Sequence, residues 1–263
     1  MTKTLLLLIF FTTQFLIAQT KRPQTLNQIL PGAYQTKEYL PLLREKRVAI
    51  FANQTSVVGN THLVDTLKKL GVNIVKIFAP EHGFRGTADA GANIQTYTDK
   101  QTGIPVVSLY GSKVKPSKED LNDVDVLLFD IQDVGVRFYT YISSLQYFLE
   151  SAIENKKPLI ILDRPNPNGF YVDGPVLDTS YKSFVGMQPI PVVYGMTLGE
   201  YATMMYTERM LSLDIQKLLP SKSENKIPGR LDDNKNGKRY RDTLSSRRKS
   251  TIGERYRRAT KQH

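Results

Sequence analysis

The sequence contains no cysteine and no tryptophan, and only three of its 263 residues are histidine. Without cysteine the protein has neither disulfide bonds nor a thiol nucleophile, so a packed apolar core has to stabilise it. Three histidines are too few to predict a multi-histidine zinc site, although one histidine with carboxylates is an alternative way to hold a metal. We expect no metal site.

The short glycine-rich motifs of common α/β enzymes are also missing. The chain has no G-x-G-x-x-G stretch for a dinucleotide and no G-x-x-x-x-G-K-[ST] stretch to cradle a phosphate. It has no G-x-S-x-G turn to present a catalytic serine either. We therefore expect no nucleotide cofactor, and no other cofactor is indicated.

Acidic residues are scarce at the carboxyl end, and this explains most of the formal net charge of +11. From Ser221 onward, 14 Lys and Arg face 5 Asp and Glu, which gives this stretch a net charge of +9. It has few apolar residues and no sustained period, so we expect residues 212–263 to form a disordered basic tail. A basic tail is usually solvated and offers only Tyr240 and Tyr256 for stacking on bases, so we expect no nucleic-acid partner.

The first 18 residues have the pattern of a secretory signal peptide. Lys3 precedes an apolar run from Leu5, and Ala18 is a small residue at which a peptidase could cleave. The run is short for a membrane span, so we expect cleavage, a secreted or periplasmic protein, and no stable membrane insertion afterwards. An uncleaved anchor is the alternative. Residues 19–44 then form a polar lead-in.

Residues 45–211 alternate between strand-like and helix-like segments. Apolar runs predict strands at 47–52, 72–79, 104–110, 124–130 and 157–163, and apolar stripes of helical spacing occur at 61–71 and 143–157. A further helix is expected from Thr197 to about Leu211, with Thr197 and Glu200 as a capping box. Continuously apolar strands between amphipathic helices indicate an α/β fold with a doubly wound, Rossmann-like parallel sheet.

Polar residues follow four of these strands at their carboxyl ends. They are Asn53 after the first strand, Glu81, His82 and Arg85 after the second, Asp130, Gln132, Asp133 and Arg137 with the fourth, and Asp163, Arg164 and Asn166 with the fifth. In an open parallel sheet these ends lie along one edge, where ligands bind. The opposite ends carry ordinary surface residues such as Lys46 and Lys157. We therefore expect one site at the carboxyl edge.

The residue types at this edge suit a sugar better than a nucleotide. Amides and guanidinium groups bind hydroxyl and carboxylate groups, and a carboxyl group in an apolar pocket can have its pKa raised enough to donate a proton. Glu81, next to Pro80 and expected to face Phe78 or Phe84, is the best candidate acid. Structural alternatives remain: an ion pair of Glu81 with Arg85, an ion pair of Asp130 with Arg137, and a turn formed by Asp163 and Arg164.

Seven ordered motifs resemble those of the NamZ-type exo-β-N-acetylmuramidase family. They are NQTSVV at 53–58, FAPEHGFRG at 78–86, GIPVVSLYG at 103–111, VDVLLFDIQDVGVRFYTYISS at 124–144, LDRPNPNG at 162–169, GPVL at 174–177 and PIPVVYGMTLGE at 189–200. The resemblance implies a secreted or periplasmic glycoside hydrolase that removes terminal N-acetylmuramic acid from the non-reducing end of peptidoglycan fragments. It also implies a Rossmann-like domain, a smaller auxiliary domain, and a site between the two.

The resemblance maps the family's proposed catalytic glutamate onto Glu81. A glycosidase commonly needs a second carboxyl group, for which Asp130, Asp163 and Asp133 are candidates. The remaining substrate-binding candidates are Asn53, His82, Arg85, Gln132, Arg137, Tyr139, Arg164 and Asn166. Either Arg85 or Arg137 could bind the lactyl carboxylate, because a planar guanidinium group can bind a carboxylate through two hydrogen bonds.

After about Leu211 the sequence departs from the family pattern. The family continues into the auxiliary domain, whereas residues 221–263 carry none of its motifs. We expect a truncated or frameshifted second domain, which would remove one wall of the site and put catalysis in doubt. A non-catalytic cell-wall saccharide-binding protein is the alternative function.

Overall fold

The computed structural model describes residues 29–86 and 96–221. Its main sheet has six strands in the order β5-β6-β4-β1-β7-β8. The strand bounds are β1 Val48–Ala52, β4 Ile74–Ala79, β5 Tyr97–Thr98, β6 Pro105–Ser108, β7 Val126–Asp130 and β8 Leu159–Ile161. The five predicted strands are confirmed, and these five run parallel to one another. The short edge strand β5 was not predicted, and it runs antiparallel to β6.

The order of the parallel strands creates a switch point between β1 and β7. The chain goes outward from β1 through β4 to β6, and then returns to the other side of β1 to form β7 and β8. The connection after β1 therefore leads to one side of the sheet, and the connection after β7 leads to the other. Rossmann-like folds bind ligands in the crevice between the carboxyl ends of two such strands. In register, Ala52 at the end of β1 pairs with Asp130 at the end of β7.

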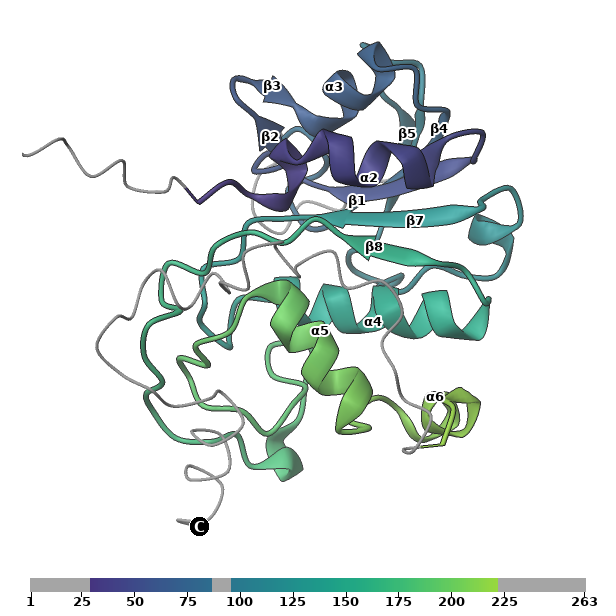
Figure 1. The fold of residues 1–263 in the computed structure, drawn as a ribbon. Coiled ribbons are helices and arrows are strands. Elements are labelled where there is room, and N and C mark those ends of the chain that lie inside the picture. Colours follow the sequence, from purple (N-terminus) through teal and green to yellow (C-terminus); the bar gives the residue numbers. More distant parts are fainter. Residues whose placement is uncertain (1–28, 87–95, 222–263) are drawn as a thin grey trace, which may run out of the picture.

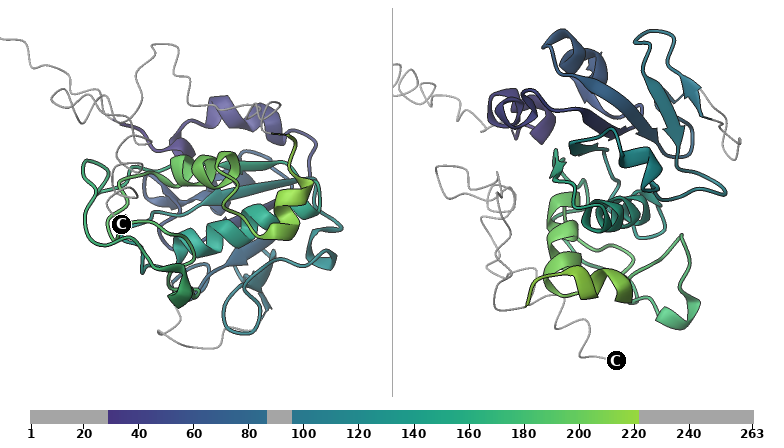
Figure 2. Two further views of the ribbon diagram at one scale, coloured as in Figure 1. Left: turned by 90° about the horizontal axis from the view of Figure 1, so that it is seen from below. Right: turned by 90° about the vertical axis from the view of Figure 1, so that its right-hand side faces the viewer.

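Helices cover both faces of the sheet, as the prediction of a doubly wound fold requires (Figure 1). Helices α2 (Thr36–Leu43) and α3 (Leu63–Lys69) lie over one face, and α4 (Tyr141–Glu154) lies over the other. Helices α5 (Leu198–Thr207) and α6 (Leu213–Leu218) pack against α4 (Figure 2). The remaining elements are short: η1 Gly32–Tyr34, β2 Val57–Val58, β3 Thr61–His62, η2 Glu119–Leu121 and η3 Thr179–Tyr181.

The segment expected as a lead-in at 19–44 contains α2, whose Tyr39 and Leu43 are buried against the sheet. The start of the predicted tail at 212 was too early, because α6 follows it and buries Ile215. The two helices have only 8 and 6 residues, so each is too short to show a clear helical period in the sequence. The predicted signal peptide and the rest of the predicted tail lie outside the described residues.

Helix α5 confirms the predicted capping box. The Thr197 hydroxyl accepts from the Glu200 backbone N–H, and the Glu200 carboxylate accepts from the Thr197 backbone N–H. The helix ends at Thr207, before the predicted Leu211, because Arg209 adopts a left-handed conformation with φ of 56°. Within the described ranges, no helix is both long and apolar enough to cross a membrane.

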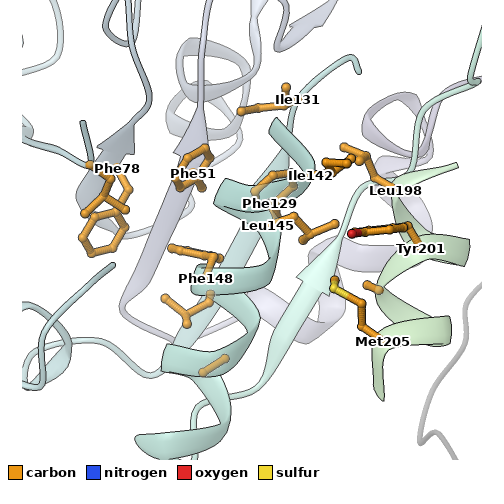
Figure 3. Packing of buried hydrophobic residues seen from close by; sticks show 14 of the residues in the cluster. Phe51, Phe78, Phe129, Ile131, Ile142, Leu145, Phe148, Leu198, Tyr201 and Met205 are labelled. Atoms are coloured by element: carbon orange, nitrogen blue, oxygen red, sulfur yellow. The ribbon is translucent and has the colours of Figure 1, made fainter. Parts of the chain in front are cut away.

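Aromatic side chains from β1, β4, β7 and α4 form the centre of one core layer (Figure 3). The Phe148 ring of α4 lies 5.2 Å from the ring of Phe51, 5.6 Å from that of Phe78 and 5.9 Å from that of Phe129, measured between centroids. Phe51 and Phe129 also stack on each other at 4.9 Å. This cluster fixes α4 on the sheet and so determines where its first turn lies.

Replacing Phe148 should destabilise the protein strongly. The side chain is fully buried, and Phe148→Ala would leave a cavity between three aromatic rings, so we expect a loss of about 3–5 kcal/mol in the free energy of unfolding. Urea unfolding measures this change. Phe170→Ala is the matched control, because Phe170 is 61% exposed and its loss should cost less than about 0.5 kcal/mol. Equal losses in the two variants would contradict the described core.

Candidate functional site

Glu81 lies in a tight turn at the carboxyl end of β4. The backbone N–H of Gly83 donates to the carbonyl of Pro80 at 3.0 Å, which closes the turn around Glu81 and His82. His82 has φ of 70°, a left-handed conformation that glycine or asparagine normally supplies in a turn. Such strain in a non-glycine residue is characteristic of functional loops. The turn therefore holds Glu81 at the edge of the sheet.

One neighbour of Glu81 is a tyrosine. Tyr110 follows β6, the neighbour of β4, and hydrogen bonding with the Glu81 carboxylate is the main cause of a raised pKa for the Tyr110 hydroxyl. Of the two phenylalanines that Glu81 was expected to face, Phe78 is buried in the core, and the Phe84 ring packs on His62 with centroids 4.4 Å apart. Glu81 thus has a phenolic hydroxyl group close to its carboxylate.

Asn53 follows β1 directly and is fully buried. Its side-chain Oδ1 accepts from both the backbone N–H and the hydroxyl of Thr55, at 2.9 and 2.6 Å. Its backbone carbonyl is 2.9 Å from Nε2 of His62, whose Nδ1 accepts from the Val64 N–H, so Nε2 is the donor. These contacts fix the amide, whose Nδ2 lies near the Tyr141 hydroxyl but makes no hydrogen bond of standard geometry with any described residue.

Asp133 lies three residues beyond β7 and is only 4% exposed. Its Oδ2 accepts from the Gly135 N–H at 2.6 Å and from the Tyr194 hydroxyl. Its Oδ1 makes no hydrogen bond with any described residue. Burial raises the pKa of Asp133, and the bond from Tyr194 opposes this rise. The predicted site residue thus presents one oxygen without a partner.

Tyr141 connects these groups, and sequence reasoning missed it. It is the first residue of α4, where the Phe148 cluster places it at the carboxyl edge. Burial raises the pKa of its hydroxyl, the neighbouring Asn53 side chain lowers it, and the charges of Asp133 and Glu81 raise it further. Tyr141 thus lies within electrostatic range of both carboxylates. Its place in the motif FYTYISS could have pointed to Tyr141. In the sequence, however, the residue is also explained as part of an amphipathic helix.

Asp130 and Arg164, both predicted site residues, form a buried ion pair. Arg164 Nε donates to Asp130 Oδ1 at 2.6 Å and Nη2 donates to Oδ2 at 2.9 Å. Burial raises the pKa of Asp130, and Arg164 lowers it. Asp130 therefore pairs with Arg164 and not with Arg137, the structural alternative considered from the sequence. With Asp130 fully buried in this pair, the geometry gives no support to its predicted catalytic role.

Asp163 caps a helix. Its Oδ1 accepts from the Gly199 N–H at 3.0 Å and its Oδ2 accepts from the Thr197 hydroxyl at 2.5 Å, both at the beginning of α5. Burial raises its pKa to about 6, against hydrogen bonds that lower it. These bonds tie β8 to α5. They account for Asp163 without the predicted catalytic role.

Arg85 forms ion pairs with two aspartates, whereas the alternative ion pair with Glu81 is not formed. Its Nε donates to Asp99 Oδ1 at 2.8 Å, and its Nη1 donates to Asp65 Oδ2 at 3.1 Å. The guanidinium group also lies 4.5 Å from the centre of the Phe84 ring. Hydrogen bonds from Arg85 lower the pKa of Asp99 to about 2. With two carboxylates already bound, Arg85 is poorly suited to a third.

Other predicted ligands lie in the same set of loops. Arg137 donates to the backbone carbonyls of Pro175 and Ile190, and no described carboxylate forms an ion pair with it. Gln132 and Asn166 donate to backbone carbonyls and so hold the loops together. Tyr139 is 49% exposed and contributes electrostatically at Tyr141. Glu81, Asn53, Asp133 and Tyr139 all act on the pKa of Tyr141, so these four residues lie around Tyr141.

In the part of the chain that the structure describes, no three His, Asp or Glu side chains are grouped closely enough to hold a metal ion. The described side chains at this site are carboxylates, amides and phenols. Glu81 lies at the rim, while Asp133 and Asn53 present one acceptor and one donor. This inventory suits the recognition and acid-assisted cleavage of a polar, uncharged group such as a sugar ring.

Comparison with known proteins decides the family. Residues 48–223 match the family described as "Exo-beta-N-acetylmuramidase NamZ, N-terminal". The chain belongs to the NamZ family. It is 45% identical over 183 residues to the peptidoglycan beta-N-acetylmuramidase NamZ of Bacillus subtilis (strain 168), a match that covers 68% of this chain and 44% of that protein.

Two crystal structures of DUF1343 family proteins from Bacteroides fragilis NCTC 9343 are similar as well. The first is 51% identical with a TM-score of 0.62, and covers 69% of this chain and 48% of its own. The second is 45% identical with a TM-score of 0.63, and covers 69% and 47%. The NamZ family resemblance and the α/β fold are therefore confirmed. The chain spans about half the length of the relatives it matches.

The raised pKa of Asp163 predicts a pH dependence of stability. Between about pH 4 and 6 the Asp163 carboxyl group is protonated in the folded protein and ionised in the unfolded chain. The stability that Asp163 gains from this protonation is therefore complete below pH 4 and is lost as the pH rises through 6. Asp163→Asn removes the titration. The free energy of unfolding of the variant, minus that of the wild type, should therefore rise by about 1–3 kcal/mol between pH 4.5 and pH 7.

Urea unfolding at several pH values measures this difference. Asp125→Asn is the control: this carboxylate pairs with Arg47, which lowers its pKa, so it stays ionised from pH 5 to 7 and its difference from wild type should stay constant. Parallel curves for wild type and Asp163→Asn would contradict the raised pKa.

Proposed function

We propose that this chain is an exo-β-N-acetylmuramidase, which removes terminal N-acetylmuramic acid from the non-reducing end of peptidoglycan fragments. The observation that carries the proposal is the grouping of Glu81, Asn53, Asp133 and Tyr141 at the switch point of the sheet. It occurs in a chain that is 45% identical to a protein named as a peptidoglycan beta-N-acetylmuramidase. Peptidoglycan-derived saccharides are accordingly the proposed partners.

Glu81 is the proposed general acid. Its carboxyl group lies on a rigid turn, half-buried, and the Tyr110 hydroxyl holds it. In the reaction it would give its proton to the glycosidic oxygen as the bond to the anomeric carbon breaks. Asp130 and Asp163 are occupied by Arg164 and by α5, so Asp133, with one unpaired oxygen, is the carboxylate best placed to contact the substrate.

Arg137 is the better candidate for the lactyl carboxylate. Both arginines considered for this role lie in edge loops, but Arg85 is bound to Asp65 and Asp99. Within the described residues, the Arg137 side chain donates only from Nη1 and only to backbone carbonyls, which leaves other donor groups of its guanidinium for a ligand. Burial lowers the pKa of Arg137, since no described carboxylate offsets the loss of solvent. A substrate carboxylate would supply the missing counter-charge.

The proposed substrate implies a location outside the cytoplasm. Peptidoglycan fragments arise in the cell wall, and residues 1–18 have the pattern of a cleaved secretory signal. We therefore propose a secreted or periplasmic enzyme. No nucleic-acid partner is proposed, because the excess positive charge lies in the basic segment after Ser221 and not at the site.

Glu81→Gln should abolish hydrolysis. Glutamine keeps the shape of the side chain but cannot donate the proton, so we expect kcat on a chromogenic β-N-acetylmuramide to fall by about 10²–10⁴-fold. Glu38→Gln is the control, because Glu38 is an exposed residue of α2 and its loss should not change the rate. Equal rates for wild type and Glu81→Gln would remove Glu81 from the mechanism. Saturable binding of the sugar without any product would instead identify a saccharide-binding protein.

Export predicts a defined amino terminus. Amino-terminal sequencing of the protein from the periplasm or the medium of a bacterial host should begin close to residue 19, because Ala18 is the expected cleavage site. Leu8→Arg interrupts the apolar run and should leave the full chain in the cytoplasm. Full-length protein with Met1 in the membrane fraction would show an uncleaved anchor and contradict the prediction.

A further inference from the structure

The unpaired polar atoms of the described residues gather at one edge of the sheet. Four buried side-chain atoms lack a hydrogen-bond partner: Asn53 Nδ2, Ser108 Oγ, Asp133 Oδ1 and Ser143 Oγ. Asn53 follows β1, Ser108 ends β6, Asp133 follows β7, and Ser143 is in the first turn of α4. A buried polar group without a partner is costly, so four of them around the carboxyl ends of the strands point to a ligand.

Two of these atoms are held in fixed orientations, and one is a hydrogen-bond donor while the other is an acceptor. The Asn53 Oδ1 accepts from two groups of Thr55, so the amide cannot be flipped and Nδ2 is the unpaired donor. The Asp133 Oδ2 accepts from Gly135 and Tyr194, so Oδ1 is the unpaired acceptor. Both residues follow strands that are neighbours in the sheet, since Ala52 pairs with Asp130. A rigid donor and a rigid acceptor thus lie on the two sides of the switch point.

Tyr141 places the donor and the acceptor around one space. Its hydroxyl neighbours the Asn53 side chain and lies within electrostatic range of Asp133 and Glu81. Phenylalanine contacts fix α4 to the sheet, and this places its first residue, Tyr141, at the carboxyl edge. Asn53, Asp133 and the proposed acid Glu81 all lie close enough to Tyr141 to change the pKa of its hydroxyl.

We propose that Asn53 and Asp133 together bind the 2-acetamido group of the substrate sugar, an inference that rests on the proposed function. Asn53 Nδ2 donates to the acetamido carbonyl, and Asp133 Oδ1 accepts from the acetamido N–H. A secondary amide satisfies both atoms at once, whereas a hydroxyl group at the same carbon satisfies only one of them well. The pair is thus a specificity determinant for 2-acetamido sugars over 2-hydroxy sugars.

Isosteric variants test this pairing without opening a cavity. In Asp133→Asn the oxygen stays opposite the Gly135 N–H and the new NH₂ group takes the place of Oδ1, so a donor meets the acetamido N–H. In Asn53→Asp the oxygen stays opposite Thr55 and a second oxygen meets the acetamido carbonyl. Asp125→Asn, at the amino end of β7, is the control, because Asp125 pairs only with Arg47 at the opposite edge.

Calorimetry with the full chain measures binding of N-acetylmuramic acid and of 3-O-lactyl-glucose, which has a hydroxyl group at carbon 2. The wild type and Asp125→Asn should prefer the acetamido sugar by about 10- to 100-fold. In Asp133→Asn and Asn53→Asp the preference should fall below about 3-fold, while the affinity for the 2-hydroxy sugar stays nearly unchanged. Thermal unfolding confirms that each variant is folded.

Equilibrium binding separates this inference from the proposed hydrolysis. A wild-type chain that binds neither sugar, or both equally, overturns the acetamido assignment, and so does an unchanged preference in the two variants. A chain that shows the predicted preference but forms no product on a chromogenic muramide upholds the acetamido site and overturns the proposed hydrolase function.

Discussion

The buried ion pair between Asp130 and Arg164 holds the site's frame together. Asp130 ends β7, Arg164 follows β8, and Arg164 also donates to the carbonyl of Val57 beyond β1. The Ser56 hydroxyl donates to the Asp130 carbonyl, which ties the Asn53 loop to the same point. Breaking a buried pair by removing one partner costs about 3–5 kcal/mol. One interaction thus fixes three loops at the switch point, and Asn53 and Asp133 depend on it for their positions.

The polar residues at the carboxyl edge fall into two groups, according to whether their hydrogen-bonding atoms have partners within the protein. Asp163, Arg85, Gln132 and Asn166 are satisfied within the protein, by a helix end, by two aspartates or by backbone carbonyls. Asn53 and Asp133 each keep one atom unpaired. The first group provides rigidity, and the second provides recognition next to Glu81. A half-buried acid beside a rigid donor and acceptor is an arrangement that preorganises a substrate for proton transfer.

The strands and the edge were predictable from the sequence, because parallel strands buried on both faces are apolar along their whole length. The capping box of α5 was predictable for a local reason, since Thr197 and Glu200 interact within one turn. The roles at the edge were not predictable in the same way. Whether Arg85 binds Glu81, Asp65 or Asp99 depends on contacts between segments far apart in the chain, and the sequence does not show which groups neutralise each other.

Tyr141 shows why recognition residues are hard to find in a single sequence. It begins a helix whose apolar stripe explains the segment without a ligand, and only the packing of Phe148 against Phe51 and Phe129 places it beside Asn53. Conversely, Asp130 and Asp163 had the residue type and position expected of catalytic groups. Their burial in internal contacts became visible only in three dimensions.

The most direct measurement is a crystal structure of this chain soaked with N-acetylmuramic acid. The account predicts the sugar at the carboxyl edge between β1 and β7, with the acetamido oxygen about 3 Å from Asn53 Nδ2 and the acetamido nitrogen about 3 Å from Asp133 Oδ1. The ring oxygen and anomeric carbon should face Glu81. A sugar bound at the amino edge, or one whose acetamido group points to solvent, would contradict it.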